Sequence, residues 1–233
     1  MNEAPFLDQR LKTISEYVDK DCTVADIGTD HAYLVAYLSA TGKIKKAFAC
    51  DINILPIKNA EKTVEKYNLS DKVSCILTNG LNGLPMYEID DIIIAGMGGN
   101  NIISILDACR EDLKGKKLIL QPMTKFEQLR EYLITHGFEL KEEHPVVSGR
   151  FVYTLMICEK NNKVWHKDRT YKFLGEIMNS PEPERYRYLK RIYINIKRRL
   201  EGLLKTTGHE DEIKTYKEVL EKIENYGGVD IES

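Results

Sequence analysis

Long apolar runs, metal-type cysteine clusters and a surplus of basic residues are all missing from these 233 residues. No apolar run approaches the ~20 residues that span a bilayer, so we expect no membrane segment. The N-terminal residues lack a basic stretch followed by an apolar one, which argues against a secretory signal. The formal net charge of -2 argues against a wholly basic nucleic-acid binder, but it allows a local basic patch.

The cysteines are odd in number and far apart, and neither they nor the histidines show metal-ligand spacing. Two of them fall in expected buried strands, where cysteine behaves as a small apolar residue. We therefore expect free thiols, no metal site and a cytoplasmic protein. The cysteines are Cys22, Cys50, Cys75, Cys109 and Cys158.

The first two-thirds of the chain alternates between strand-like and helix-like segments. Residues 91–95 form a continuous apolar run, which is typical of a central parallel strand. The other expected strands are 22–28, 46–51, 72–78 and 117–121, and the expected helices are 31–40, 55–67, 100–113 and 124–136. Thr124 and Glu127 have the spacing of an N-terminal capping pair for the last helix.

Two strand-like segments, 138–147 and 151–159, follow and are joined by a short link that contains Ser148-Gly149. Such a short link requires antiparallel pairing. A doubly wound sheet that ends in an antiparallel hairpin is of the methyltransferase type and is unusual for nicotinamide-binding domains. The expected fold class is therefore α/β, a Rossmann-like class I methyltransferase sheet.

Strand patterns disappear after Lys160, and two stripes of apolar residues with helical spacing cover 185–205 and 213–223. They predict a C-terminal antiparallel helical hairpin, coiled-coil-like in character. We expect one unit over residues 1–162 and a second over 163–233. The expected helix over 185–205 also carries a dense set of charges, which fits either a solvated face or a phosphate-binding one. This set is Arg185, Arg187, Lys190, Arg191, Lys197, Arg198, Arg199 and Lys205, with Tyr186, Tyr188 and Tyr193 between them.

The turn after the first expected strand, residues 26–31, lies where ligands bind in open α/β sheets. Gly28 allows close approach of a ligand to the backbone. Asp30 and Tyr33 occupy the places of the second and third glycines of a dinucleotide fingerprint, and a carboxylate there would repel a pyrophosphate. Asp26 and Asp30 instead suit a ligand with an ammonium or sulfonium group.

Polar and glycine-rich residues also follow the next strands. Asp51 can accept hydrogen bonds from both hydroxyls of a ribose, and Asn79-Gly80 can meet an adenine edge. Residues 95–99, Ala-Gly-Met-Gly-Gly, can present bare backbone to a flat ligand. Each feature alone also fits a strand-end turn, but together with the first turn they favour a binding site. Gln121-Pro122 is expected to face the same cleft.

These motifs resemble those of the bacterial tRNA (adenine(22)-N(1))-methyltransferase family. The resemblance rests on Arg10-Leu11, residues 26–33, residues 95–99 and Gln121-Pro122, and it covers most of residues 1–160. It implies S-adenosylmethionine as cofactor and tRNA as partner, with methylation at N1 of adenine 22. Two positions depart from the family pattern, since Met123 replaces a frequent asparagine and Asn79 replaces an acidic residue.

The resemblance also implies roles for single residues. Those implied for cofactor binding are Arg10, Asp26, Gly28, Thr29, Asp30, His31, Asp51, Ile52, Asn79, Gly80, Ala95, Gly96 and Gly98. Those implied for catalysis are Asp30, Met97 and Gln121. The ring nitrogen of adenine has a lone pair at neutral pH, so we expect direct in-line transfer without a covalent nucleophile. The target base has to be unpaired or flipped out.

Other functions fit parts of the sequence. A small-molecule methyltransferase would share everything inferred for residues 20–160 but would not need the basic helix. A non-catalytic protein that binds S-adenosylmethionine could use its helical hairpin to recruit a partner. A nicotinamide dehydrogenase is disfavoured by Asp30. We expect a monomer or weak dimer.

Overall fold

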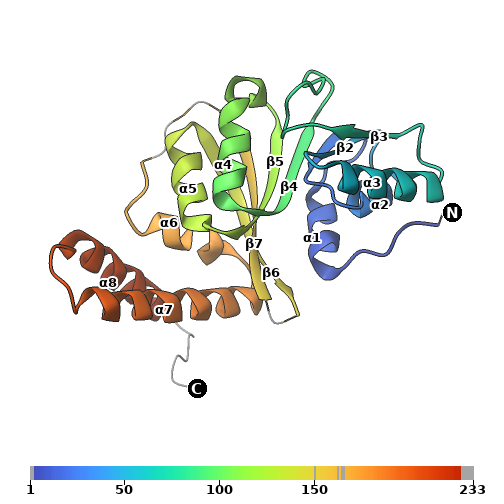
Figure 1. Ribbon diagram of the computed structural model, residues 1–233. Coiled ribbons are helices and arrows are strands. Elements are labelled where there is room, and N and C mark those ends of the chain that lie inside the picture. Colours follow the sequence, from blue (N-terminus) through green and yellow to red (C-terminus); the bar gives the residue numbers. More distant parts are fainter. Residues whose placement is uncertain (1–2, 150, 162, 164–165, 227–233) are drawn as a thin grey trace.

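The computed structural model describes residues 3–149, 151–161, 163 and 166–226. Its centre is a seven-stranded sheet of order β3-β2-β1-β4-β5-β7-β6 (Figure 1). The first five strands are parallel, and β7 runs antiparallel to both β5 and β6. The strands are β1 (Thr23–Ile27), β2 (Lys46–Asp51), β3 (Val73–Leu77), β4 (Asp91–Gly98), β5 (Lys117–Thr124), β6 (Phe138–Ser148) and β7 (Phe151–Lys160). This arrangement confirms the predicted fold class.

Helices cover both faces of the sheet, which explains why its central strands are apolar on both sides. In β4, Ile93 packs with α1, α2 and α3, whereas Ile92 and Ile94 pack with α4 and α5 on the opposite face. The helices are α1 (Gln9–Tyr17), α2 (Tyr33–Ala40), α3 (Ile54–Lys66), α4 (Gly99–Ala108), α5 (Phe126–Thr135), α6 (Tyr171–Leu174), α7 (Glu184–Leu203) and α8 (Glu210–Asn225).

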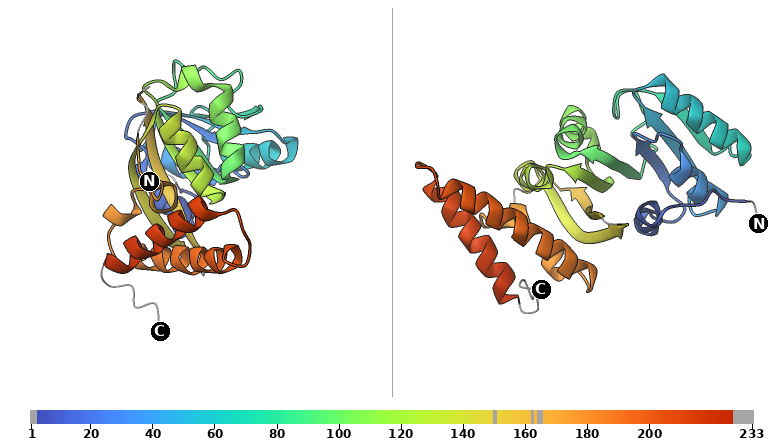
Figure 2. Two further views of the ribbon diagram at one scale, coloured as in Figure 1. Left: turned by 90° about the vertical axis from the view of Figure 1, so that its left-hand side faces the viewer. Right: turned by 60° about the horizontal axis from the view of Figure 1, so that its bottom comes forward.

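The C-terminal helices form a third hydrophobic cluster of their own. The stripes of α7 and α8 face each other and enclose Ile192, Ile196, Val219 and Ile223, each at most 2% exposed. Figure 2 shows this pair at the end of the molecule opposite α3. The predicted helical hairpin is confirmed. The predicted division of the chain places residue 162 at the boundary, and this residue lies outside the described ranges.

A buried ion pair joins the sheet to the C-terminal helices. Arg130 of α5 donates to the Glu143 carboxylate of β6 at 2.7 Å, and both side chains are 0% exposed. Arg130 also donates to the hydroxyl of Tyr188 in α7 at 2.6 Å. Its remaining donors reach the backbone carbonyls of Lys172 and Phe173. One side chain therefore connects α5, β6, α6 and α7 through satisfied hydrogen bonds.

The fourth and fifth strands are longer than predicted. We expected them to end at Ala95 and Gln121, but β4 continues to Gly98 and β5 to Thr124. Their register is irregular in this extension, where Met97 pairs with Pro122. Proline is tolerated there because an irregular ladder does not require its missing N–H. Residues 95–98 of the Gly-rich segment thus form the end of a strand, and Gly99 begins the next helix.

Helix starts also differ from the predictions. Thr124 is not an N-cap, because α5 begins at Phe126 after Lys125, which has a φ of 58° and makes no side-chain cap. Glu127 instead accepts a hydrogen bond from Arg199 at 2.9 Å. The helix predicted to begin at 31 begins at Tyr33, since left-handed residues precede it. The helix predicted over 100–113 divides into α4 and a 3-10 helix, Arg110–Leu113.

No helix within the described residues is long and apolar enough to cross a bilayer. In the same part of the chain, no cluster of three or more His, Cys, Asp or Glu side chains has the arrangement of a metal site. Cys22, Cys50 and Cys158 are buried as free thiols. Cys75 is only half-buried, because β3 is an edge strand with one open side.

Candidate active site

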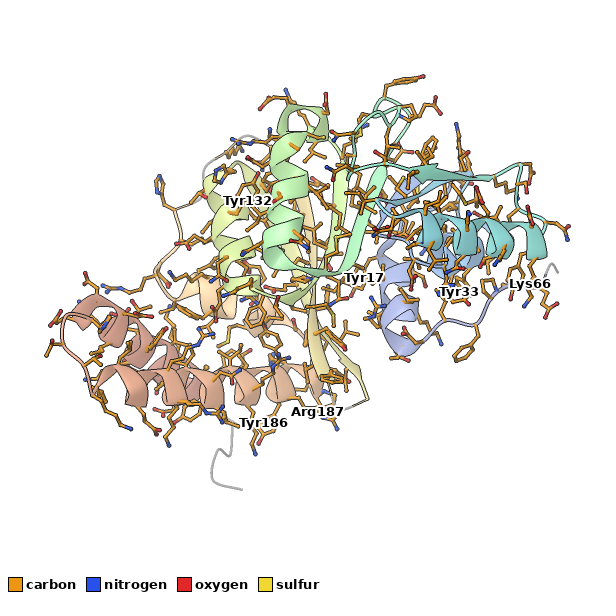
Figure 3. The ribbon with its side chains drawn as sticks, viewed as in Figure 1. Tyr17, Tyr33, Lys66, Tyr132, Tyr186 and Arg187 are labelled. Atoms are coloured by element: carbon orange, nitrogen blue, oxygen red, sulfur yellow. The ribbon has the colours of Figure 1, made fainter. Side chains whose placement is uncertain are left out.

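A cavity of about 220 Å³ opens at the carboxyl ends of β1 and β4. The strand order reverses here, because β2 and β3 lie on one side of β1 and β4 lies on the other. Figure 3 shows Tyr33 on α2 near α1, the two helices that contribute to the rim. The cavity is lined by Arg10, Leu11, Asp26, Gly28, Thr29, Asp30, His31, Tyr33, Leu34 and Ala95.

Backbone hydrogen bonds fix the turn between β1 and α2. The N–H groups of Gly28 and Thr29 both donate to the carbonyl of Cys50, at 2.8 and 3.0 Å. Gly28 has a φ of 80°, and the methyl group of Met97 occupies the space that a Cβ would need. Asp30 and Ala32 have φ values of 50° and 55°. Non-glycine residues in this region are strained, and such strain is concentrated at ligand sites.

Asp26 is a buried carboxylate at the floor of the cavity. It is 6% exposed and accepts a hydrogen bond of 2.7 Å from the Thr29 hydroxyl. Burial raises its pKa from 3.8 to about 6, against the lowering effects of Thr29 and of the Arg10 charge. The protein therefore only partly compensates this carboxylate, so a ligand cation beside it would be stabilised.

Asp30 and His31 lie at the open rim. The side chain of Asp30 is 71% exposed, and its carboxylate is 3.7 Å from the ring of His31. The His31 ring stacks on Tyr33 with 5.2 Å between ring centroids and 7° between planes. These three side chains form a flat, partly acidic edge beside the cavity.

Arg10 enters the cavity from α1. The Asp8 carboxylate caps this helix by accepting from the N–H of Leu11 at 2.7 Å. The guanidinium of Arg10 donates to Oε1 of Gln121 at 3.1 Å. Gln121 is 0% exposed and, although predicted as catalytic, lies behind Arg10 rather than on the cavity surface.

Comparison with known proteins identifies the family. A sequence model described as "Methyltransferase domain" matches residues 7–156. The tRNA (adenine(22)-N(1))-methyltransferase of Bacillus subtilis is 37% identical over 164 residues, which are 70% of this chain and 68% of that protein. The chain belongs to the tRNA (adenine(22)-N(1))-methyltransferase family. The resemblance inferred from the motifs is confirmed.

Solved structures of this family share the fold over nearly the whole chain. The B. subtilis M1A22 tRNA methyltransferase TrmK has a TM-score of 0.83 and 25% identity, covering 97% of this chain and 99% of that one. TrmK of M. capricolum, solved with S-adenosyl-homocysteine, has a TM-score of 0.78 and 28% identity, again covering 97% and 99%.

Some of the residues predicted from the sequence to bind the cofactor lie together around the cavity. The predicted residues that line it are Arg10, Asp26, Gly28, Thr29, Asp30, His31 and Ala95. Three further lining residues, Leu11, Tyr33 and Leu34, were not predicted as site residues. Leu11 and Tyr33 stand within the quoted motifs, which was a usable signal. Leu34 gave none, because an apolar residue on a helix fits the core equally well.

The other predicted cofactor residues lie beyond the cavity at neighbouring strand ends. Asp51 ends β2, and one of its oxygens accepts hydrogen bonds from the backbone and side-chain nitrogens of Asn53. Ile52 is 61% exposed. Asn79 is exposed after β3, and Gly80 packs on Ile105.

The remaining predicted residues extend along β4. Gly96 has a φ of 80° and lies beside the Arg10 guanidinium. Gly98 is next to the Thr124 hydroxyl, and Met97 is half-buried over Gly28. Of the three glycines in this segment, only Gly96 has a positive φ, so the alternative of a tight turn accounts for one of them.

Proposed function

We propose that this protein transfers a methyl group from S-adenosylmethionine to N1 of adenine 22 in tRNA. The observation that carries the proposal is the cavity with a partly compensated carboxylate, Asp26, near the guanidinium of Arg10. These opposite charges match the ammonium and carboxylate of an amino acid. Family membership supports the same substrate pair.

Different residues around the cavity and at the neighbouring strand ends would bind different parts of the cofactor. Asp26 would hold the ammonium and Arg10 the carboxylate of the cofactor. Asp51 keeps one oxygen clear of the Asn53 contacts, and this oxygen is available to ribose hydroxyls. The exposed side chain of Ile52 and the segment Asn79-Gly80 would border the adenine.

The chemistry requires positioning more than proton transfer. The bound sulfonium supplies the methyl group. Asp30, exposed at the rim, is placed to stabilise the positive charge that develops on the methylated base. Alignment of reacting atoms contributes roughly 7–11 kcal/mol in well-oriented reactions. Burial raises the pKa of Cys22 to about 12 and that of Cys75 to about 11, which leaves these thiols unsuited to nucleophilic attack.

The exposed face of α7 would contact the tRNA backbone. Arg187, on the side of α7 turned away from the sheet in Figure 3, is exposed, as are Lys197 and Arg198. The tyrosines do not form the expected interleaved surface, because Tyr188 and Tyr193 are 1% and 7% exposed and point into the helical core.

We also infer a cytoplasmic location from family membership, because tRNA is the substrate of the family. The monomeric or weakly dimeric state stays a prediction. The division into units 1–162 and 163–233 stays a proposal. It agrees with the separate hydrophobic cluster of the C-terminal helices.

The first test is methyl transfer from labelled S-adenosylmethionine into an unmodified tRNA transcript, followed by nucleoside analysis. We expect 1-methyladenosine in the normal transcript and none in a transcript with guanine at position 22. Binding of the cofactor without transfer to any RNA would favour the non-catalytic alternative. Transfer to a small metabolite in place of tRNA would favour the small-molecule enzyme.

A second test concerns the exposed face of α7. Replacing Lys197 and Arg198 by glutamine should raise the tRNA KM and reduce its salt dependence, because phosphate contacts release counterions. Arg199 is a poorer choice, since it already pairs with Glu127. The matched control replaces exposed Lys58 and Lys62 of α3, at the other end of the molecule. Equal effects of both double variants would remove α7 from the RNA surface.

A further inference from the structure

Gln121 is buried in β5, just before the irregular end of the strand, although its position in the motif predicted a catalytic contact. The residue is 0% exposed, and both ends of its amide are engaged. A group that touches substrate needs an accessible polar atom. Gln121 therefore acts through the residues that its amide binds and does not contact the substrate itself.

The neighbours of Gln121 define the orientation of its amide. Nε2 donates to the carbonyl of Pro122 at 3.1 Å, which leaves Oε1 directed at the Arg10 guanidinium, 3.1 Å away. In the opposite orientation the amide nitrogen of Gln121 would face the N–H groups of Arg10, and its oxygen would face the carbonyl of Pro122, so neither hydrogen bond could form. Strand β5 thus presents one fixed acceptor to Arg10 at the last position of its regular pairing with β4.

A fixed neutral acceptor has a specific consequence for Arg10. The Arg10 charge acts on Asp26, but in the described part of the chain no direct ion pair joins the two. A freely rotating guanidinium would be drawn to the buried carboxylate, and each charge would then neutralise the other. Gln121 accepts the Arg10 hydrogen bond without carrying a charge. The positive charge of Arg10 is therefore not compensated by Gln121 and stays available to a ligand in the cavity.

We propose that Gln121 is a positioning residue that holds Arg10 apart from Asp26, so that the cavity keeps two separate poles for the carboxylate and ammonium of an amino-acid zwitterion. This inference rests on the proposed use of S-adenosylmethionine. It assigns recognition of the amino-acid part of the cofactor to a contact between α1 and β5.

The test compares two ligands that differ only in this part. S-adenosylhomocysteine contains the amino acid, whereas 5′-methylthioadenosine has the same nucleoside and thioether without it. Calorimetric titration of the full chain should show that Gln121→Met weakens S-adenosylhomocysteine binding about tenfold, or about 1.4 kcal/mol. Binding of 5′-methylthioadenosine should change less than about twofold, because no charge of that ligand faces Arg10.

Two further variants make the result decisive. Arg10→Met should lose the same preference, and the double variant should lose little more, as expected for residues that act through one contact. Gln121→Glu retains size and hydrogen bonding, so it provides the test if Gln121→Met does not fold. Its carboxylate should neutralise Arg10 and again reduce only the affinity for S-adenosylhomocysteine.

The outcomes separate this inference from the proposed function. Equal weakening of both ligands, or an unchanged preference in both Gln121 variants, would overturn the positioning role. A wild-type protein that binds neither ligand would overturn the proposed function instead.

Discussion

Two arginines on helices beside the same sheet have opposite surroundings. Arg130 of α5 is completely buried and binds the Glu143 carboxylate, a tyrosine hydroxyl and two carbonyls. Arg10 of α1 is half-exposed and has the neutral Gln121 as its hydrogen-bond partner. The first holds two parts of the protein together, and the second leaves its charge available at a cavity. The difference lies in whether the protein itself supplies the opposite charge.

The pKa values of the buried charges at the two arginines show the same difference. Burial opposes the charge of Arg130, but the Glu143 carboxylate more than compensates and keeps its pKa above the ordinary value. At the cavity, burial of Asp26 is not compensated to the same extent, and its pKa is raised to about 6. A matched buried pair is a structural element, whereas a poorly matched buried charge is a binding element.

The largest expected effect comes from breaking the matched pair. Arg130→Met leaves Glu143 buried without its counter-ion and should lower the free energy of unfolding by about 3–5 kcal/mol, measured by urea denaturation. The control is Lys46→Met, which removes the partly exposed ion pair with Glu88 and should change stability little. Similar losses in the two variants would show that Arg130 is no more structural than a surface cation.

A smaller effect of opposite sign is expected at Asp26. Asp26→Asn should stabilise the ligand-free protein at pH 7, because it removes a buried charge. The shift from 3.8 to about 6 corresponds to about 3 kcal/mol as an upper limit. In the wild-type protein, the ionised Asp26 lowers the free energy of unfolding fully above pH 6. This loss disappears as the pH falls toward 3.8, because Asp26 becomes protonated in the folded state before it does in the unfolded state.

The measurement is urea denaturation of both proteins at pH 7 and pH 4.5, together with titration of S-adenosylhomocysteine. The stability difference should shrink at the lower pH, and the variant should bind the ligand more weakly. A destabilised variant at pH 7 would mean that Asp26 is structural, and the contrast with Arg130 would then disappear.

The smallest effects concern the starts of the helices that carry the two arginines. Asp8→Ala removes the cap of α1 and should cost about 1 kcal/mol of unfolding free energy. Thr124→Ala should change it by less than about 0.5 kcal/mol, because Thr124 does not cap α5. A larger loss for Thr124→Ala than for Asp8→Ala would restore the capping role predicted from the sequence.

Local patterns in the sequence predicted most of the fold but little of its fine geometry. The order of strands and helices, the hairpin of β6 and β7 and the pairing of α7 with α8 all follow from periodicity and short links. Periodicity did not reveal that β5 passes through Pro122, because only the irregular register with Met97 makes a proline acceptable there. Nor did it place Lys125 in a left-handed conformation before α5.

The sequence by itself determined the sheet, its reversed edge and the acidic turn that contains Asp26 and Asp30. These depend on residues close together in the chain, where spacing and conformational preference act directly. Only the tertiary structure decided that Arg10 meets Gln121, 111 residues away, and that Arg130 meets Glu143 and Tyr188. Such partners are chosen by packing of distant segments, and that packing determines which arginine is matched inside the protein and which is left for a ligand.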